Sequence, residues 1–399
     1  MNTTLTTLGD CCTIVSGSTP DTNISEYWDG EICWATPKDL SELSSAYIHT
    51  TPRKLTRAGL DSCSATILPA DSVLFSSRAP IGHVAINTVR MCTNQGFKSF
   101  IPDSKKVLAK FLYYWLKFNR KQLENLGNGA TFKELSKAIV SQVQILLPPI
   151  DEQRRIAAVL DKAEALRAKR RQAISKLDIL LHSVFLDMFG DPVTNPKRFP
   201  IKPIQEFGSV ITGNTPSRSN PEFFGKEIEW IKSDNINSPS YILTKAEEGL
   251  SEKGRKVGRV VSAGSSLVTC IAGSPDCIGN VGLADREVAF NQQINAVTPN
   301  GETNPSFFYV QLLLAKRLIQ RASTNSMKGM VSKSSFSGIN LLAPDKPLQD
   351  RFGFWFERFL VLHRKSVDAA GVSDTLFRSL QQRAFNGELH LRASSSPSA

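Results

Sequence analysis

The sequence predicts a mixed α/β fold made of two duplicated globular domains separated by two long antiparallel helices, with a pseudo-two-fold relation. Three observations support this prediction. Short motifs recur with a nearly constant separation of 196 or 197 residues. Each copy contains β-branched runs broken by glycine and proline, followed by apolar residues at helical spacing. Each copy then ends in a long helical pattern, the first of which has more than thirty residues without proline or glycine.

The duplication is visible in several short motifs. SGSTP at Ser16–Pro20 recurs as TGNTP at Thr212–Pro216, and EICW at Glu31–Trp34 recurs as EIEW at Glu227–Trp230. Weaker matches join Ala79–Ile86 to Pro275–Leu283, Phe111–Leu116 to Phe307–Leu312, Gln153 to Gln349, and Phe189 to Phe385. Chance matches would scatter in register, so the nearly constant offset indicates an internal repeat.

The boundaries follow from where the patterns change. We expect globular domains at 1–147 and 191–345, long helices at 148–190 and 346–390, and a flexible tail at 391–399. The β-branched runs within 72–87 and 265–284 predict strands and tight turns in both domains. Apolar residues at helical spacing within 108–126 and 305–322 predict a shorter helix in each domain.

The long helices carry apolar residues mostly three or four positions apart, as in a coiled coil. In the first helix these are Ile156, Leu160, Ala163, Leu166, Ala173, Leu177, Leu180 and Val184, with Arg170 intruding; in the second they are Phe352, Trp355, Phe359, Leu362, Ala369, Leu376 and Leu380. Thirty-five helical residues span about 50 Å, so neither helix can bury its stripe alone. We expect the two helices to pack along each other. The alternative is that each helix packs only on its own domain.

Composition narrows the class of function. The net charge of +11 and the pI of about 9.3 favour a polyanionic partner such as nucleic acid, although a merely basic surface would give the same count. The N-terminus has no secretory pattern and no apolar run approaches a membrane span, so we expect a soluble, cytoplasmic protein. The seven cysteines include no C-x-x-C pair, which makes a disulfide framework or a metal site unexpected.

Catalytic motifs are missing from the sequence. It contains no G-x-x-x-x-G-K-[ST] phosphate loop and no N-P-P-[FYW] or D-P-P-[FYW] tetrapeptide. The single G-x-G, at Gly127–Gly129, follows a helical pattern and is typical of a helix stop. We therefore expect no catalytic residue, cofactor site or metal site in this chain. A self-sufficient methyltransferase or nuclease and an interaction scaffold that reads no sequence remain the alternatives.

Two similar basic domains suit two separate parts of one extended ligand, and duplex DNA is the simplest candidate. Arginine, lysine and amide side chains near predicted turns can bind bases or phosphates, although many would be ordinary solvated residues. The candidate DNA contacts in the first domain are Thr19, Lys38, Arg78, Gln95, Lys98 and Lys133. Those in the second domain are Thr215, Arg218, Lys232, Asn235, Gln292, Gln293, Lys328 and Lys333.

The chain resembles the specificity (S) subunit of Type I restriction-modification systems. The matching text is SGSTP…YWDGEICWATPKDL with its second copy, the segment LLPPIDEQRRIAAVLDKAEALRAKRRQAISKLDILLHSVFLDMFGD, and SDTLFRSLQQRAFNGEL near the C-terminus. The resemblance covers the chain except for its last ten residues. The second long helix departs from the pattern, because it keeps only one of the two prolines and lacks the glutamate before Gln349.

The resemblance implies two target-recognition domains, each reading one half of a bipartite, asymmetric DNA site. It implies that the two helices fix the gap between the half-sites. It also implies a non-catalytic subunit of a phage-defence complex that docks two methyltransferase subunits on its helices and, through them, the restriction subunits. S-adenosylmethionine, ATP and Mg are then expected on the partner subunits, with no membrane and no homo-oligomer required. The departure in the second helix leaves open whether both docking surfaces are alike.

Overall fold

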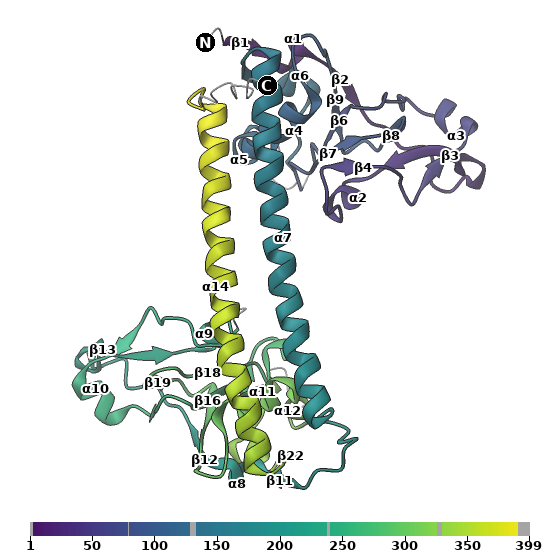
Figure 1. The fold of residues 1–399 in the computed structure, drawn as a ribbon. Coiled ribbons are helices and arrows are strands. Elements are labelled where there is room, and N and C mark those ends of the chain that lie inside the picture. The colour runs from purple at the N-terminus through teal and green to yellow at the C-terminus, as the bar shows by residue number, and fades with distance from the viewer. Residues whose placement is uncertain (1–2, 79, 128–132, 238–239, 325–328, 390–399) are drawn as a thin grey trace, which may run out of the picture. The chain divides into compact units, whose positions relative to one another are not determined.

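The computed structural model describes residues 3–78, 80–127, 133–237, 240–324 and 329–389 (Figure 1). The chain divides into two compact units. Unit 1 comprises Met1–Lys169 and Ala370–Ala399, and unit 2 comprises Arg170–Ala369. Each unit contains one globular module and one half of each long helix. We call the part from β1 to β10 module 1 and the part from β11 to β22 module 2.

Module 1 is a pair of small sheets covered by short helices. The five-stranded sheet has the order β2 (Cys12–Ser16), β9 (Lys98–Pro102), β6 (Val73–Phe75), β7 (Val84–Asn87) and β4 (Tyr47–Ile48). The three-stranded sheet has the order β5 (Lys54–Leu55), β3 (Trp28–Ala35) and β8 (Met91–Thr93). The strands β1 (Thr4–Thr7) and β10 (Gln144–Leu147) pair antiparallel and join the two ends of the module.

The helices of module 1 are mostly single turns. They are α1 (Leu8–Cys11), η1 (Ser25–Tyr27), α2 (Pro37–Ser41), α3 (Arg57–Asp61), α4 (Ala109–Phe118), α5 (Arg120–Leu126) and α6 (Lys137–Ser141). The longest, α4, buries six consecutive residues from Phe111 to Leu116. Its aromatic side chains join Phe75 and Phe100 of the sheet in one core, which explains why an all-round apolar pattern forms a buried helix here.

Module 2 repeats this plan with local changes. One four-stranded sheet has the order β12 (Gly208–Thr212), β20 (Ile294–Pro299), β16 (Ser266–Thr269) and β18 (Val281–Leu283). The other has the order β14 (Gly249–Leu250), β13 (Phe224–Ile231), β19 (Val288–Phe290) and β15 (Val260–Val261). Two further pairs are β11 (Ile201–Pro203) with β22 (Asn340–Leu342) and β17 (Ile271–Ala272) with β21 (Gly329–Met330).

The helices of module 2 are equally short. They are α8 (Ile204–Phe207), η2 (Pro221–Phe223), α9 (Ser233–Ile236), α10 (Glu252–Val257), η3 (Pro275–Cys277), α11 (Pro305–Leu314), α12 (Lys316–Arg321) and α13 (Lys333–Ser337). The two modules also share an irregularity in strand pairing. The register of β3 against β5 shifts between Trp28 and Ile32, and the register of β13 against β14 shifts between Phe224 and Ile228. The prediction of two duplicated mixed α/β modules is confirmed.

The long helices are α7 (Ile150–Phe189) and α14 (Lys346–Phe385), each of 40 residues. A buried glutamine fixes the first turn of each. Gln153 accepts a hydrogen bond from the Leu108 amide (2.9 Å) and donates to the carbonyls of Lys106 (2.8 Å) and Pro148 (2.9 Å). Gln349 repeats two of these contacts, accepting from the Asn304 amide (3.0 Å) and donating to the Pro344 carbonyl (2.9 Å).

Within each unit, α7 and α14 pack side by side and antiparallel. In unit 1, Arg167 Nε lies 2.6 Å from Asp374 Oδ1. In unit 2, Asp178 Oδ1 lies 3.3 Å from His363 Nε2, and Phe185 packs edge-on against Phe352. Arg167 and His363 are equivalent positions of the repeat, 196 residues apart, and so are Asp178 and Asp374. The two polar pairs are therefore equivalent contacts, with the roles of α7 and α14 exchanged between the units.

The predicted apolar stripe is only partly buried. Leu166 and Leu376 of unit 1 remain 42% and 50% exposed, and Leu180 and Leu362 of unit 2 remain 46% and 53% exposed. The contacts between the helices near these leucines are the polar pairs Arg167–Asp374 and His363–Asp178. The apolar residues at the two ends of each helix belong to the module cores. The alternative arrangement, in which each helix packs only on its own module, is wrong because both helices contribute to both cores.

Among the helices of the described residues, none is long and apolar enough to cross a membrane.

Candidate nucleic-acid interface

The repeated SGSTP and TGNTP motifs form a loop directly after β2 and β12. A Cβ atom at Gly17 would lie within 2.5 Å of the carbonyl oxygens of Thr93 and Asn94. At Gly213 it would lie equally close to the carbonyl oxygens of Phe290 and Asn291. Only glycine therefore lets this loop approach the segment before β9 or β20, which explains why the motif recurs.

A tryptophan holds the same loop from the other side. Trp34 Nε1 donates a hydrogen bond to the Ser18 carbonyl at 3.0 Å. Trp230 Nε1 donates to the Asn214 carbonyl at 3.2 Å. These bonds connect the EICW and EIEW motifs to the loop, so both repeated motifs serve one local structure.

A threonine–glutamine pair lies at the surface of this structure in both modules. Thr19 Oγ1 donates to Gln95 Oε1, and Thr215 Oγ1 donates to Gln292 Oε1. Both glutamines are exposed, and neither amide N–H group has an acceptor among the residues that the structure describes. The structure thus brings four of the predicted contacts together as two equivalent pairs.

Two of the four predicted cations of module 1, Arg78 and Lys98, contact one carboxylate. Arg78 Nε lies 2.9 Å from Glu134 Oε2, and Lys98 Nζ lies 3.5 Å from Glu134 Oε1. The Ser77 amide donates to the Gly96 carbonyl at 2.7 Å, which places Arg78 beside the loop that carries Gln95. The two cations and one anion leave a net positive charge at this loop.

Module 2 has a similar triad built from other positions. Arg218 NH2 lies 2.9 Å from Glu248 Oε2, and Lys232 Nζ pairs with Glu248 Oε1. The hydrogen bond from Lys232, and then that from Arg218, holds the pKa of Glu248 below its usual range. Selection of basic side chains alone missed Glu134 and Glu248, which orient the cations.

An aromatic pair lies beneath an arginine in both modules. Trp28 and Trp34 meet edge-to-face with centroids 5.0 Å apart, and their equivalents Phe224 and Trp230 meet at 6.1 Å. The guanidinium of Arg218 lies 5.0 Å from the Phe224 centroid and 5.4 Å from that of Trp230.

In module 1 the corresponding arginine is Arg53, which the sequence did not single out. Its guanidinium lies 3.6 Å from the Trp28 centroid and 5.1 Å from that of Trp34. The sequence does show that aromatic residues recur at positions 28 and 34 and at positions 224 and 230. That recurrence does not identify the cation that lies over the rings.

Two predicted amides are already engaged within module 2. Asn235 accepts from the Lys232 amide (3.0 Å) and donates to Thr244 Oγ1 (3.2 Å) and the Lys245 carbonyl (3.1 Å). Gln293 Oε1 accepts from Ser233 Oγ (3.0 Å) and Asn291 Nδ2 (3.0 Å). These side chains shape the loops around Lys232 and Gln292.

The remaining predicted contacts are less closely connected. Lys38 is an exposed residue of α2, 3.9 Å from Glu42. Lys133 and Lys333 are exposed, the latter in the first turn of α13. Lys328 lies outside the described residues.

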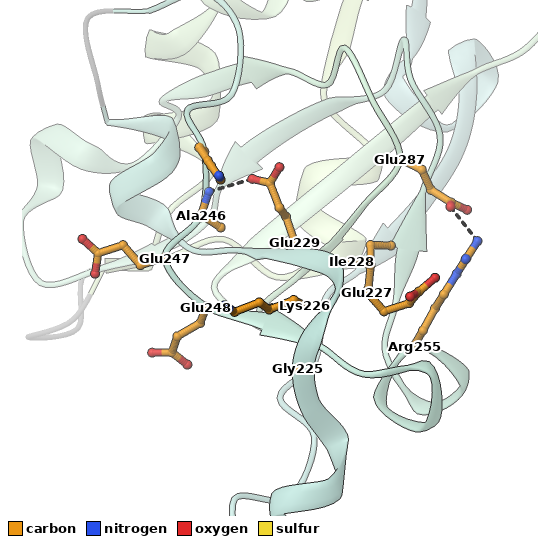
Figure 2. Close-up of a pocket in the computed structure, with 12 residues that line it drawn as sticks. Gly225, Lys226, Glu227, Ile228, Glu229, Ala246, Glu247, Glu248, Arg255 and Glu287 are labelled. Atoms are coloured by element: carbon orange, nitrogen blue, oxygen red, sulfur yellow. Dashed lines mark hydrogen bonds and ion pairs between the residues drawn. The ribbon is translucent and has the colours of Figure 1, made fainter.

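One cavity of module 2 is acidic and differs in character from the loops above. It is a hollow of about 520 Å³ beside β13 and β14 in module 2, lined by Glu227, Glu229, Glu247, Glu248 and Glu287 among others (Figure 2). Arg255 pairs with Glu287 at 2.6 Å, and Glu229 accepts from the Ala246 amide at 2.7 Å. The excess of carboxylates disfavours a phosphate here. We therefore place the candidate interface at the loop formed by Ser16–Pro20 in module 1 and Thr212–Pro216 in module 2, and not in this cavity. We call this loop the glycine loop.

Within the described residues, no group of three or more His, Cys, Asp or Glu side chains could hold a metal ion. All seven cysteines are free thiols.

The duplicated module, with basic and aromatic side chains at the same loop in each copy, is typical of a protein that contacts an extended polyanion at two places. The chain belongs to the family described as Type I restriction modification DNA specificity domain, whose model matches residues 2–176 and 196–358.

Curated relatives are specificity subunits. The Type I restriction enzyme MjaIX specificity subunit of Methanocaldococcus jannaschii is 34% identical over 240 residues, covering 56% of this chain and 55% of that protein. The HindI specificity subunit of Haemophilus influenzae is 29% identical over 203 residues, covering 49% and 42%. The chain thus spans about half the length of the curated relatives it matches.

Solved structures share the fold over nearly the whole chain. The S subunit of a Type I restriction-modification system from M. genitalium gives a TM-score of 0.61 at 13% identity, covering 96% of both chains. A chain from work on complex assembly and conformational transition of the type I R-M system gives 0.58 at 16% identity, covering 97% of this chain and 98% of that one.

Proposed function

We propose that this chain is the non-catalytic, sequence-reading subunit of a Type I restriction-modification complex. Each module reads one half of a bipartite, asymmetric DNA site. The observation that carries the proposal is the glycine loop, which presents a threonine–glutamine pair and an arginine over an aromatic pair in both modules.

The two half-sites are expected to differ in sequence, because the side chains around the shared loop differ. Lys38 corresponds to Asp234, and Lys232 corresponds to Thr36. The triads on Glu134 and Glu248 come from positions that are not equivalent in the repeat. Different donors and charges at the same site favour different bases.

The long helices are proposed to dock two methyltransferase subunits and, through them, the restriction subunits. Leu166 and Leu180 of α7 correspond to Leu362 and Leu376 of α14, and all four stay about half-exposed. Apolar side chains kept at the surface in both copies are typical of a protein contact. Helix α7 also exposes Ile179 (63%) and Leu186 (43%), whereas α14 also exposes Phe354 (61%), Val361 (57%), Val367 (44%) and Val372 (67%). The docking surface of α14 is therefore expected to be the more apolar one.

S-adenosylmethionine, ATP and Mg are proposed to bind the partner subunits and not this chain. Incubation of the isolated chain with duplex DNA and the methyl donor tests this directly. We expect no methyl transfer until methyltransferase subunits are added, and transfer by the chain alone would contradict the proposal.

Selection of a random duplex library by the complex assembled with methyltransferase subunits tests the main proposal. We expect a consensus of two unlike half-sites with a fixed gap. Competition with scrambled duplex is the control, since an interaction scaffold would bind both equally through its charge. The absence of a bipartite consensus would overturn the proposed function.

A further inference from the structure

The aromatic pair of each module carries one arginine, but the two arginines come from different places in the chain. Arg53 precedes β5, whereas Arg218 follows the glycine loop. The repeat equivalent of Arg218 is Thr22. The equivalent of Arg53 is Glu248, because the Trp34 amide bonds to the Arg53 carbonyl and the Trp230 amide bonds to the Glu248 carbonyl. The rings recur in both copies as Trp28/Trp34 and Phe224/Trp230. In each copy an arginine contacts both rings, but it comes from a different segment of the chain.

The contact with the rings leaves the Arg53 guanidinium ready to bind a ligand. In module 2, Arg218 and Lys232 share the single carboxylate of Glu248, so that triad keeps a net positive charge. A guanidinium over an aromatic face keeps its N–H edge free, because the ring contacts the plane and not the donors. Arg53 is exposed, and it has no carboxylate partner within the part of the chain that the structure describes. The stack therefore holds a charged, oriented donor at the surface.

The arginine also lies next to the pair already described. Trp34 contacts Arg53 with its ring and donates its indole N–H to Ser18, the neighbour of Thr19. In module 2, Trp230 makes the same connection between Arg218 and the residue before Thr215. Each module thus combines an arginine with a threonine–glutamine pair around one tryptophan, on β3 and β13 respectively (Figure 1).

We propose that Arg53 is the counterpart of Arg218 and that both bind a backbone phosphate of the DNA, one in each half-site. The reason for a phosphate is that the rest of the two surfaces differs. The two modules are proposed to read different half-sites, yet both place an arginine on the aromatic pair. A feature common to both suits the phosphate backbone, which is the part of DNA that does not vary with sequence. The proposal rests on the proposed function and adds to it a residue that positions module 1 on its half-site.

The test uses the complex assembled with methyltransferase subunits and a duplex carrying its consensus. Arg53→Ala is expected to lower affinity roughly ten-fold at low salt. It should reduce the slope of log affinity against log salt by about 0.9, the value for one phosphate contact. The consensus should stay unchanged. Arg218→Ala should do the same, and Arg53→Lys should keep the slope but lose part of the affinity, because lysine retains the charge without the planar stack.

Arg57→Ala is the matched control, since Arg57 is an exposed arginine four residues away whose partner is Asp61. An equal effect of Arg57→Ala would show that only net charge matters and would overturn the proposal. Relaxed preference at one base in Arg53→Ala would assign a guanine contact instead and would also overturn it. If the wild-type complex has no bipartite consensus, the proposed function fails; if it has one and Arg53→Ala binds like the wild type, only this inference fails.

Discussion

At the residue scale, the glycine loop can form because Gly17 and Gly213 have no side chain. Neither Gly17 nor Gly213 has a positive φ, so their role comes from the space they leave and not from a left-handed conformation. The absent side chain lets the loop bond to the segment before β9 or β20, as in the 2.9 Å bond from the Ser18 amide to the Thr93 carbonyl. The threonine–glutamine pair depends on this close approach.

Gly213→Ala is therefore expected to destabilise module 2. The new Cβ would meet two backbone oxygens, which cannot move like the end of a flexible side chain, and the cost is about 3 kcal/mol. Gly301→Ala is the control, because nothing lies within 4 Å of its added Cβ, and it should change stability by less than about 1 kcal/mol. Urea unfolding with hydrogen exchange resolved by module gives the measurement. Equal stability of the two variants would show that the loop can move away.

At the element scale, the start of each long helix is set by one side chain. The LPP and EQ motifs of the first copy lie together because the Gln153 side-chain amide bonds to the Pro148 carbonyl. The same amide also bonds to the backbone of Lys106 and Leu108. Gln349 serves α14 in the same way although one proline and the glutamate are missing there. The glutamine, more than the prolines, thus explains why the second helix begins at the equivalent place.

Gln153→Leu should loosen the junction between α7 and module 1. It would leave the partly buried Leu108 amide and the Lys106 and Pro148 carbonyls without their partner, at a cost of about 3 kcal/mol. Hydrogen exchange at the Leu108 amide should accelerate strongly. Gln172→Leu, at an exposed position of the same helix, should leave that amide protected and stability within about 0.5 kcal/mol. Continued protection of Leu108 in Gln153→Leu would mean that another group replaces the amide.

The helices also show where prediction from sequence succeeds and where it stops. A constant offset reveals a duplication, and the spacing of apolar residues reveals helices, because both are local properties of the chain. What lies opposite a residue is not local. Leu166 and Leu362 have the spacing of buried seam residues but remain exposed, since Arg167 with Asp374 and His363 with Asp178 take the contact instead.

The candidate site was predictable to a similar degree. Thr19 and Gln95 lie 76 positions apart, and only the fold joins them. Charge alone selected Arg78 and Lys98 but gave no reason to choose Glu134, which holds both. Arg53 was missed because its value comes from two rings that reach it through the tertiary structure.

At the scale of the whole molecule, each long helix contributes one half to each compact unit. Both helices are uninterrupted across the division between the units, and Gly371 lies inside α14 without breaking it. A continuous helix has a fixed rise per residue. If the two modules read two half-sites, the number of residues in the helices is expected to determine the number of base pairs between them.

Insertion of one helical turn in both helices tests this relation. Four residues placed between Lys169 and Arg170, and four between Ala369 and Ala370, fall where the units divide and so leave the contacts of each unit intact. They add about 6 Å, close to two base pairs of DNA at about 3.4 Å each. We expect the gap in the selected consensus to grow by about two base pairs while both half-sites stay the same. The same four residues inserted after Gly301, in a surface turn, should leave the gap unchanged. An unaltered gap in the helix variant would show that something other than these helices sets the spacing.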